Sequence, residues 1–361
     1  MSFFRACATG FAGMALAVGL WLPPAPSAAE DFDSIKAAAA KEGRLVVWHN
    51  TPKQETTEAL AALFNKRFGM DIKIERVSTN GGDMTSRLIA EKRGGKFTID
   101  MFIATDRQLP QLVKNGLIAK VDWLGLFGGP GKLDEAALKS AVDTIIPDFR
   151  GYGLELRDTI FGIAYNTKLI AAKDVPTRWE DLGDAKWSRK LIIDEELSPL
   201  ARLLPAMGRD AVLALGRKIV ANHPIYADGQ PSAARKLTSG EGPIGAFSLS
   251  SAQEEKQKGA PVELVFAEPQ GIISQQLVYV PATAPHPNLA RLWAAWITSE
   301  GMATKPMLDE GIYRAWPGSP GPFGDYTAKH NVKIRRADTI QELEDSNSIR
   351  KDLNAVVSAG R

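Results

Sequence analysis

The chain has 361 residues, with 44 lysines and arginines against 42 aspartates and glutamates, and it contains a single cysteine. The formal net charge of +2, with both signs spread along the chain, gives no support for nucleic-acid binding or for a polybasic membrane patch. A single hydrophobic core rarely serves a chain longer than about 250–300 residues, so we expect two lobes.

The first 29 residues have the order of a secretory signal peptide. Arg5 gives a positive start, residues 10–22 are apolar but short for a membrane span, and residues 27–29 are small, as at a cleavage site. We expect cleavage after Ala29, and an uncleaved membrane anchor is the alternative. The sole cysteine, Cys7, leaves with this segment, so the mature chain offers no disulfide and no thiolate. No later stretch is apolar and long enough for a membrane helix, which predicts a soluble product outside the cytoplasm.

A strand, a polar turn and a helix follow one another near the start of the mature chain. Residues 45–48 are a short apolar run with β-branched members, which predicts a strand buried on both faces. Thr51 and Gln54 are spaced to cap each other's free N–H groups, with Pro52 at the first helical position. The helix is then marked by apolar residues at helical spacing: Leu60, Leu63, Phe64 and Phe68. Such a turn lies at the carboxyl end of a strand, where open α/β folds bind ligands, although it could also be a helix cap and nothing more.

The same order occurs twice more before residue 120. Residues 72–77 alternate between apolar and polar, and residues 99–104 form another apolar run, so both are predicted strands. Helices are predicted after them, at 84–92 and at 109–115. Three strand–helix units in succession predict a parallel sheet with right-handed crossovers.

The second half of the chain continues with short strands and helices. The predicted strands lie at 152–166 (one long strand or two), 191–193, 243–247, 261–266 and 277–280. Ser198 and Pro199 predict a second helix start of the cap-plus-proline kind. Residues 288–299 predict a helix with Leu289, Trp293 and Trp296 on one face.

Five segments resemble the family 1 extracellular solute-binding proteins, which are the periplasmic receptors of ABC importers, and in particular their iron(III)-binding-like branch. They are GRLVVW at 43–48, IDMF at 99–102, YNTKL at 165–169, WEDL at 179–182 and APHPNLARL at 284–292. The last is followed by Thr-Ser-Glu-Gly at 298–301, where the family often has Ser-Pro-Glu-Gly. The five segments occur in the family's order, and the resemblance spans residues 40–318.

The resemblance implies an α/β fold of the type II periplasmic binding proteins. Two lobes would be joined by two crossing hinge strands, with the ligand cleft between the lobes and closure by hinge motion. Lobe one would comprise residues 30–160 and 266–312, and lobe two residues 161–265 and 313–361. The implied function is the periplasmic substrate-binding component of an ABC importer, which captures a small polar solute or ion and delivers it to a permease in the inner membrane. It implies no catalysis and no cofactor, and we expect a monomer.

The candidate ligand-binding residues lie where predicted strands end and should meet in the cleft. They are His49, Asn50, Thr51, Ser78, Thr79, Thr105, Asp106, Glu195, Glu196, Ser248 and Ser250, with Asn80 beside them. Their hydroxyl and amide groups suit an anion or a polar organic molecule. Glu195 and Glu196 suit a cation or an ammonium group, or else they compensate the dipole of the following helix.

One departure from the family concerns metal binding. Its iron-binding members hold iron(III) with two adjacent tyrosines, because phenolate oxygens are hard ligands for a hard cation. The matching stretch here, residues 247–250, reads Phe-Ser-Leu-Ser, and the four histidines are scattered without ligand spacing. We therefore predict no metal site and keep an iron(III) receptor as an alternative function.

Enzyme motifs are absent from the sequence. It has no Gly-x-Ser-x-Gly, no His-Glu-x-x-His and no dinucleotide glycine fingerprint. We predict that the protein is not an enzyme. An enzyme on the same two-lobed fold, or a binding module that feeds a sensor, remains an alternative.

Overall fold

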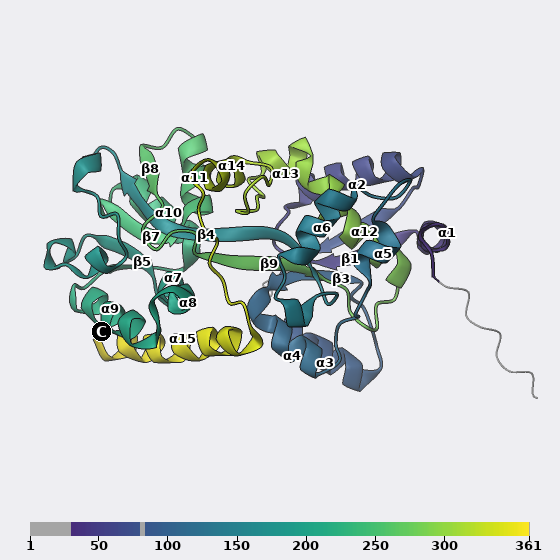
Figure 1. Ribbon diagram of the computed structural model, residues 1–361, viewed down its shortest axis with the longest axis horizontal. Helices are drawn as coiled ribbons and strands as arrows, with labels where there is room; N and C mark the ends of the chain where they lie inside the picture. The colour runs from purple at the N-terminus through teal and green to yellow at the C-terminus, as the bar shows by residue number, and fades with distance from the viewer. Residues whose placement is uncertain (1–29, 80–83, 361) are drawn as a thin grey trace, which may run out of the picture.

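The computed structural model describes residues 30–79 and 84–360. The predicted signal peptide, its cleavage site after Ala29, and Asn80 lie outside the described residues. The described chain forms two lobes joined by two long strands (Figure 1). None of the helices in the described ranges is long and apolar enough to span a membrane.

The first lobe contains the first half of the described chain together with a later helical segment. Its helices are α1 (Phe32–Glu42), α2 (Gln54–Phe68), α3 (Met84–Gly94), α4 (Leu109–Lys114), α5 (Trp123–Phe127), α6 (Glu135–Asp143), α12 (Pro287–Ile297) and α13 (Lys305–Asp309), with 3-10 turns η2 (Asp106–Gln108), η3 (Pro147–Phe149) and η7 (Glu300–Ala303). Its strands are β1 (Arg44–Trp48), β2 (Lys73–Val77) and β3 (Met101–Thr105). Strand β1 pairs in parallel with both β2 and β3, so the predicted parallel arrangement is confirmed.

The second lobe is built in the same manner. Its strands are β5 (Leu191–Asp194), β6 (Ile225–Ala227), β7 (Ile244–Ser248) and β8 (Val262–Val265). Its helices are α7 (Ser198–Arg202), α8 (Leu204–Met207), α9 (Arg209–Ala221), α10 (Gly229–Ser239) and α11 (Leu249–Gln257), with 3-10 turns η4 (Ala172–Asp174), η5 (Glu180–Gly183) and η6 (Ala185–Trp187). Strand β5 pairs in parallel with β6 and β7.

Two antiparallel strands connect the lobes and complete one sheet in the order β2-β1-β3-β9-β4-β7-β5-β6, with β8 paired to β4. They are β4 (Leu154–Asn166) and β9 (Ile273–Tyr279), and β4 is one strand rather than two. Leu154 and Leu156 pack in the core of the first lobe, whereas Phe161 and Ile163 pack in the core of the second. The same strand therefore belongs to both cores, which makes β4 and β9 the hinge strands. The exact lobe boundaries stay a prediction.

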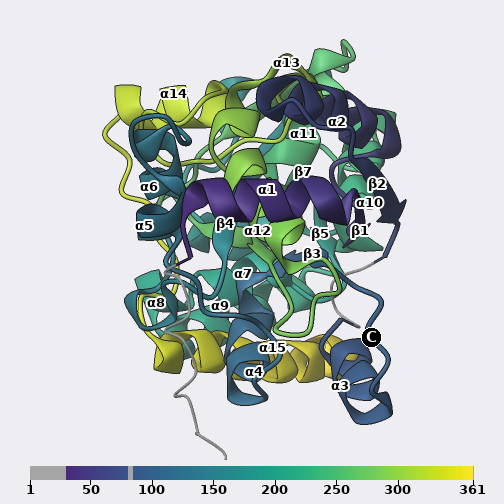
Figure 2. The same cartoon turned by 90° about the vertical axis from the view of Figure 1, so that its right-hand side faces the viewer.

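Helix α12 is the centre of the first lobe. Leu289, Trp293 and Trp296 are buried, and the two tryptophan rings pack against Phe64 of α2. Helix α1 packs against the outside of α12 (Figure 2). Gly43 ends α1 in the left-handed region, at φ +65°, where a side chain would be strained, and this lets the chain enter β1 directly.

Two predicted helix starts and one predicted core position are wrong. Helix α2 begins at Gln54, and its N-cap is Lys53 rather than Thr51. The Lys53 N–H donates to both carboxylate oxygens of Glu310, at 3.0 Å. This free N–H at the start of α2 is therefore satisfied by a side chain distant in the sequence, and not through the predicted capping pair of Thr51 and Gln54. The N-cap of α7 is Leu197, and Ser198 is its first helical residue. Leu63, expected on the buried face of α2, is 38% exposed.

The C-terminal segment returns across both lobes. After α14 (Pro322–Lys329), helix α15 (Ile340–Gly360) runs along the lower edge of the molecule, from beneath the hinge strands towards α9 (Figure 1). Its Leu343 packs in a core of the first lobe, whereas Ile349 and Leu353 pack in the core of the second lobe. Helix α15 therefore bridges the two lobes.

Candidate functional site

A small cavity lies between the lobes, beside the hinge strands. Its volume is about 150 Å³, and it is lined by Thr105, Arg107, Thr159, Phe161, Ser198, Ala201, Arg202, Gln230, Ser274, Ser346 and Arg350. These residues come from the end of β3, from both hinge strands, from α7 and α10, and from α15. Both lobes and the bridging helix therefore contribute to one partly open cavity.

Three hydroxyl groups in this cavity are unengaged. The hydroxyls of Thr159, Ser274 and Ser346 form no hydrogen bond with any residue that the structure describes. Thr159 and Ser274 face each other as register partners on β4 and β9. Ser274 and Ser346 are largely buried, and their hydroxyls remain accessible from the cavity. Hydroxyls that line a cavity without a protein partner are the groups to which a polar ligand can bond.

The charged residues that line the cavity are all arginines: Arg107, Arg202 and Arg350. The Arg202 guanidinium forms a bidentate ion pair with Asp106, at 3.0 and 3.1 Å, and both side chains are buried. Arg350 is paired with Glu196. The Arg107 guanidinium has no hydrogen-bond or ion-pair partner within residues 30–79 and 84–360. The lining therefore carries an uncompensated positive charge.

A buried carboxylate fixes the second-lobe side of the cavity. Asp194, at the end of β5, accepts hydrogen bonds from the backbone N–H and the hydroxyl of Ser198 and from the Gln230 amide. The Gln230 carbonyl accepts in turn from the Ser248 N–H, at 2.7 Å. Burial raises the pKa of Asp194, while these donors oppose the shift. The network holds Ser198 and Gln230 in position at the cavity wall.

The predicted site residues are distributed unevenly around this cavity. Thr105 lines it, and Asp106 is buried beside it in the pair with Arg202. Glu196 reaches it indirectly through Arg350, whereas Glu195 is exposed. Ser248 is the N-cap of α11, where its hydroxyl accepts from the Ser251 N–H.

The remaining predicted residues do not line the cavity. Asn50 and Thr51 lie in the turn after β1, Ser78 and Thr79 follow β2, and Ser250 lies within α11. Their part in ligand binding stays a prediction.

His49 lies inside the protein instead of facing the solvent. The residue is 2% exposed, and its Nδ1 atom has no hydrogen-bond partner in the described part of the chain. Burial, with the nearby charge of Arg76, lowers the pKa of His49 to about 3. Arg76 donates to the carbonyls of Asn50 and Pro52, both at 2.9 Å, and so orders the turn that follows β1.

Local sequence signals missed most of the cavity residues. Arg107 directly follows Thr105 and Asp106, so its position could have been included with the same strand end. Thr159 and Ser274 are 115 positions apart and become neighbours only through the pairing of β4 and β9. Ser346 and Arg350 lie on a helix that carries no ligand-like motif.

A second group of buried charged residues lies around hinge strand β4 and does not line the cavity. Glu155 and Asp158 on β4 lie near Arg314, which donates to the Glu155 carbonyl. The Ala315 N–H donates to Asp158, at 2.7 Å. The Oδ1 atom of Asp158 and the Oε2 atom of Glu155 have no donor among the described residues. Burial, followed by the charge of Glu155, raises the pKa of Asp158 well above its usual value.

We expect Asp158→Asn to stabilise the protein at neutral pH. The folded state keeps a proton on Asp158 at pH values where the unfolded chain has lost it, so stability falls as pH rises from about 4 through the folded-state pKa. An asparagine carries no such charge, can still accept from Ala315 and can donate to Glu155. Urea denaturation at pH 4 and pH 8 should show a gain for the variant that is larger at pH 8. Asp309→Asn, at a side chain that is 59% exposed, is the control. A variant that is less stable than wild type at pH 8 would contradict this account.

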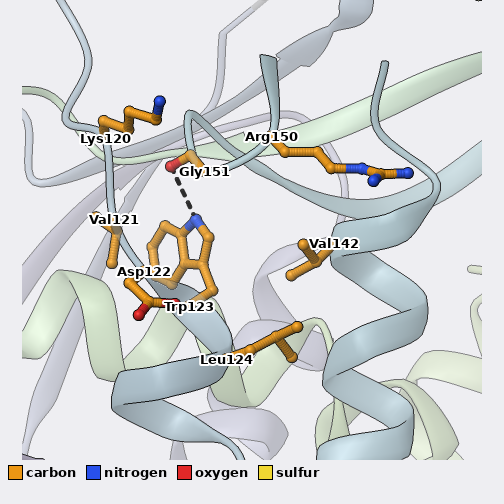
Figure 3. Close-up of a pocket in the computed structure, with 8 residues that line it drawn as sticks. All are labelled: Lys120, Val121, Asp122, Trp123, Leu124, Val142, Arg150 and Gly151. Carbon is orange, nitrogen blue, oxygen red and sulfur yellow. Dashed lines mark hydrogen bonds between the residues drawn. The ribbon is translucent and has the colours of Figure 1, made fainter. Parts of the chain in front are cut away.

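A larger hollow, of about 460 Å³, lies on the first lobe away from the hinge cavity (Figure 3). Its wall is formed by the start of α5, by Val142 of α6 and by the loop at Arg150 and Gly151. The Trp123 indole donates to the Gly151 carbonyl, at 3.0 Å, so its polar group is already satisfied. None of the predicted strand ends contributes to this hollow.

The chain has similarity to known proteins along most of its length. Residues 59–321 match the family described as bacterial extracellular solute-binding protein. An uncharacterised protein of Haemophilus influenzae is 25% identical over 250 residues, which are 64% of this chain and 66% of that protein. The chain thus spans slightly less than two thirds of the length of this curated relative.

Several solved structures have the same fold. Iron-bound HitA from Pseudomonas aeruginosa matches with a TM-score of 0.62 and 18% identity, over 86% of this chain and 99% of that one. The apo ferric ion-binding protein A of Pasteurella haemolytica matches with 0.66 and 14%, over 88% and 98%. AfuA from Actinobacillus pleuropneumoniae, with exogenous fructose-6-phosphate bound, matches with 0.62 and 21%, over 87% and 97%. The predicted two-lobed α/β fold of the periplasmic binding proteins is confirmed by these similarities.

Proposed function

The chain belongs to the bacterial extracellular solute-binding protein family, and on that premise we propose that it is the periplasmic receptor of an ABC importer. It captures a small polar solute in the cavity between its lobes, closes about the hinge strands and delivers the solute to a permease in the inner membrane. The mature protein begins after Ala29, acts as a monomer without binding nucleic acid, and catalyses no reaction.

The observation that carries this proposal is the composition of the cavity between the lobes. Thr105 is supplied by the first lobe, Ser198 and Gln230 by the second, and Thr159 and Ser274 by the hinge strands. A solute held there contacts both lobes and the hinge at once, so its binding energy favours the closed arrangement.

An iron(III) receptor is the alternative function, since HitA is described as iron-bound. The cavity lining argues against it, because it contains no tyrosine or carboxylate, the oxygen ligands that a hard cation prefers, and no histidine. Within residues 30–79 and 84–360, no group of three or more histidine, cysteine, aspartate or glutamate side chains could hold a metal ion.

A thermal-shift screen across metals, anions, amines, sugars and organic acids tests the receptor function. A solute at a hundredfold excess over its Kd should stabilise the folded state by about 2.7 kcal/mol. Small-angle X-ray scattering should then show a smaller radius of gyration, as expected for closure.

We predict that Thr105→Val weakens the binding of that solute about tenfold, because the half-buried Thr105 hydroxyl, which donates to Gln108 at 2.7 Å, is lost as a hydrogen-bond partner for the solute. Calorimetric titration measures this change. Thr238→Val is the matched control, since the Thr238 hydroxyl bonds to the Arg235 carbonyl in α10 and does not line the cavity. A screen in which no solute stabilises the protein, or equal affinity in wild type and Thr105→Val, would exclude the cavity as the binding site.

A further inference from the structure

We propose that the solute is a compact oxyanion and that helix α15, from outside the region matched by the family, supplies part of its binding site. This inference rests on the proposed receptor function and names the ligand class for the same cavity. The family match ends at residue 321, whereas α15 spans Ile340–Gly360. Ser346 and Arg350 of α15 line the cavity.

The charges that line the cavity indicate whether the ligand is an anion or a cation. Every charged side chain that lines the cavity is an arginine, and Arg107 has no counter-ion in the described part of the chain. The Arg350 side chain is only 17% exposed, and burial lowers its pKa, so its charge is incompletely solvated. An anion beside Arg107 would compensate its unpaired charge and could share Arg350 with Glu196, whereas a cation would be repelled by both arginines.

The hydrogen-bonding groups decide the kind of anion. Thr159, Ser274 and Ser346 present hydroxyls to the cavity that bond to no other residue in the described part of the chain. An arginine fork pairs with two oxygens of a carboxylate or phosphoryl group, and the hydroxyls can donate to the oxygens that remain. A chloride ion offers no such set of directed acceptors, so the site fits a group with several oxygens.

The volume of the cavity limits the size of the ligand. About 150 Å³ corresponds to roughly five water molecules, which is below the approximately 300–1,000 Å³ of pockets for drug-sized ligands. The space suits a phosphoryl or carboxylate head with a short substituent. Phe161, which also lines the cavity, offers an apolar surface for that substituent.

Helix α15 is placed to couple anion binding to closure. The Asn347 amide donates to the Arg107 carbonyl of the first lobe, at 3.4 Å, and Arg350 pairs with Glu196 of the second lobe. The anion site is therefore complete only when the first lobe, the second lobe and α15 come together. The ligand would then favour the closed form through contacts that the open form lacks.

The test uses the mature chain at low ionic strength with defined probes. Inorganic phosphate and methylphosphonate represent phosphoryl groups, succinate represents carboxylates, and glucose and putrescine are the neutral and cationic comparisons. Isothermal titration should show binding of at least one phosphoryl or carboxylate probe, and the stronger of the two groups identifies the head group. Glucose and putrescine should not bind.

Variants then assign the contacts. Arg107→Gln and Arg350→Gln should each weaken the anion probe by about tenfold to a hundredfold, the effect expected for hydrogen bonds to a charged group. Arg107→Lys, which keeps the charge but loses the planar fork, should lie in between. The matched control is Arg209→Gln, because Arg209 pairs with Asp352 of α15 without lining the cavity.

The outcomes separate this inference from the receptor function. Binding of glucose or putrescine that Thr105→Val weakens, with no anion binding, overturns the oxyanion assignment and leaves the receptor function standing. Anion binding that is unchanged in Arg107→Gln and Arg350→Gln overturns the assigned contacts. An equal loss in Arg209→Gln and Arg350→Gln shows that α15 acts only by docking. If none of the five probes binds, the oxyanion assignment fails, whereas the receptor function is decided by the wider thermal-shift screen.

Discussion

Replacing Arg202 with methionine is expected to lower the free energy of unfolding by about 3–5 kcal/mol. Arg202 and Asp106 form two hydrogen bonds across the interface between the lobes, with side chains that are 10% and 2% exposed. The substitution leaves the Asp106 carboxylate charged and without its counter-ion in a site from which water is excluded. The cost arises from this uncompensated charge more than from the loss of the ion pair itself.

Urea denaturation of single and double variants checks this expectation. The double variant Asp106→Asn/Arg202→Met removes both charges and should recover much of the loss. Arg178→Met is the matched control, because Arg178 pairs with Glu180 at the surface, with side chains 60% and 44% exposed. Such a pair contributes about 1 kcal/mol or less. If Arg202→Met changes stability no more than the control does, the pair is not buried in solution.

The Arg202→Met variant also tests whether the ion pair restrains the opening of the lobes. Asp106 lies in η2 of the first lobe and Arg202 in α7 of the second, so their pair must separate when the cleft opens. We expect the radius of gyration of the empty Arg202→Met protein to exceed that of wild type in X-ray scattering. That result would show that the pair helps to set the balance between the open and closed forms, and an unchanged radius of gyration would contradict it.

Acidification is expected to destabilise the protein through His49, by roughly 3 kcal/mol between pH 7 and pH 4. Burial lowers the folded-state pKa of His49 to about 3, whereas the unfolded chain takes up this proton near pH 6.5. The unfolded state therefore binds more protons throughout this window, and stability is lost as the pH falls from 6.5 towards 3.

His49→Gln should remove this part of the acid sensitivity, because glutamine stays neutral at every pH in the window. The measurement is the difference in unfolding free energy between pH 7 and pH 4, so a constant packing cost of the substitution cancels. His330→Gln, at an exposed histidine, is the control and should keep the wild-type difference. An unchanged difference in His49→Gln would mean that His49 is accessible and charged in the folded protein.

Prediction of the fold from sequence succeeded where the signal was local and periodic. The apolar run of β1, the alternation of β2 and the tryptophan-bearing face of α12 each specify one element by its own side chains. The order of these elements then predicts the parallel pairing of β1 with β2 and β3. Helix starts were predicted less well, since the cap of α2 depends on Glu310, about 250 positions away.

The candidate site likewise contains features that the sequence predicts and features that depend on the tertiary structure. Sequence by itself determined the periodic elements such as β1 and α12, the parallel strands of the first lobe and polar strand ends such as Thr105, because short-range periodicity and the direction of a strand settle these features. Only the tertiary structure decided that Asp106 is neutralised by Arg202, that His49 is buried, and that Arg350 reaches the cavity. Charge compensation, desolvation and cavity shape depend on residues that are distant in the chain and become neighbours only when the two lobes and α15 pack together.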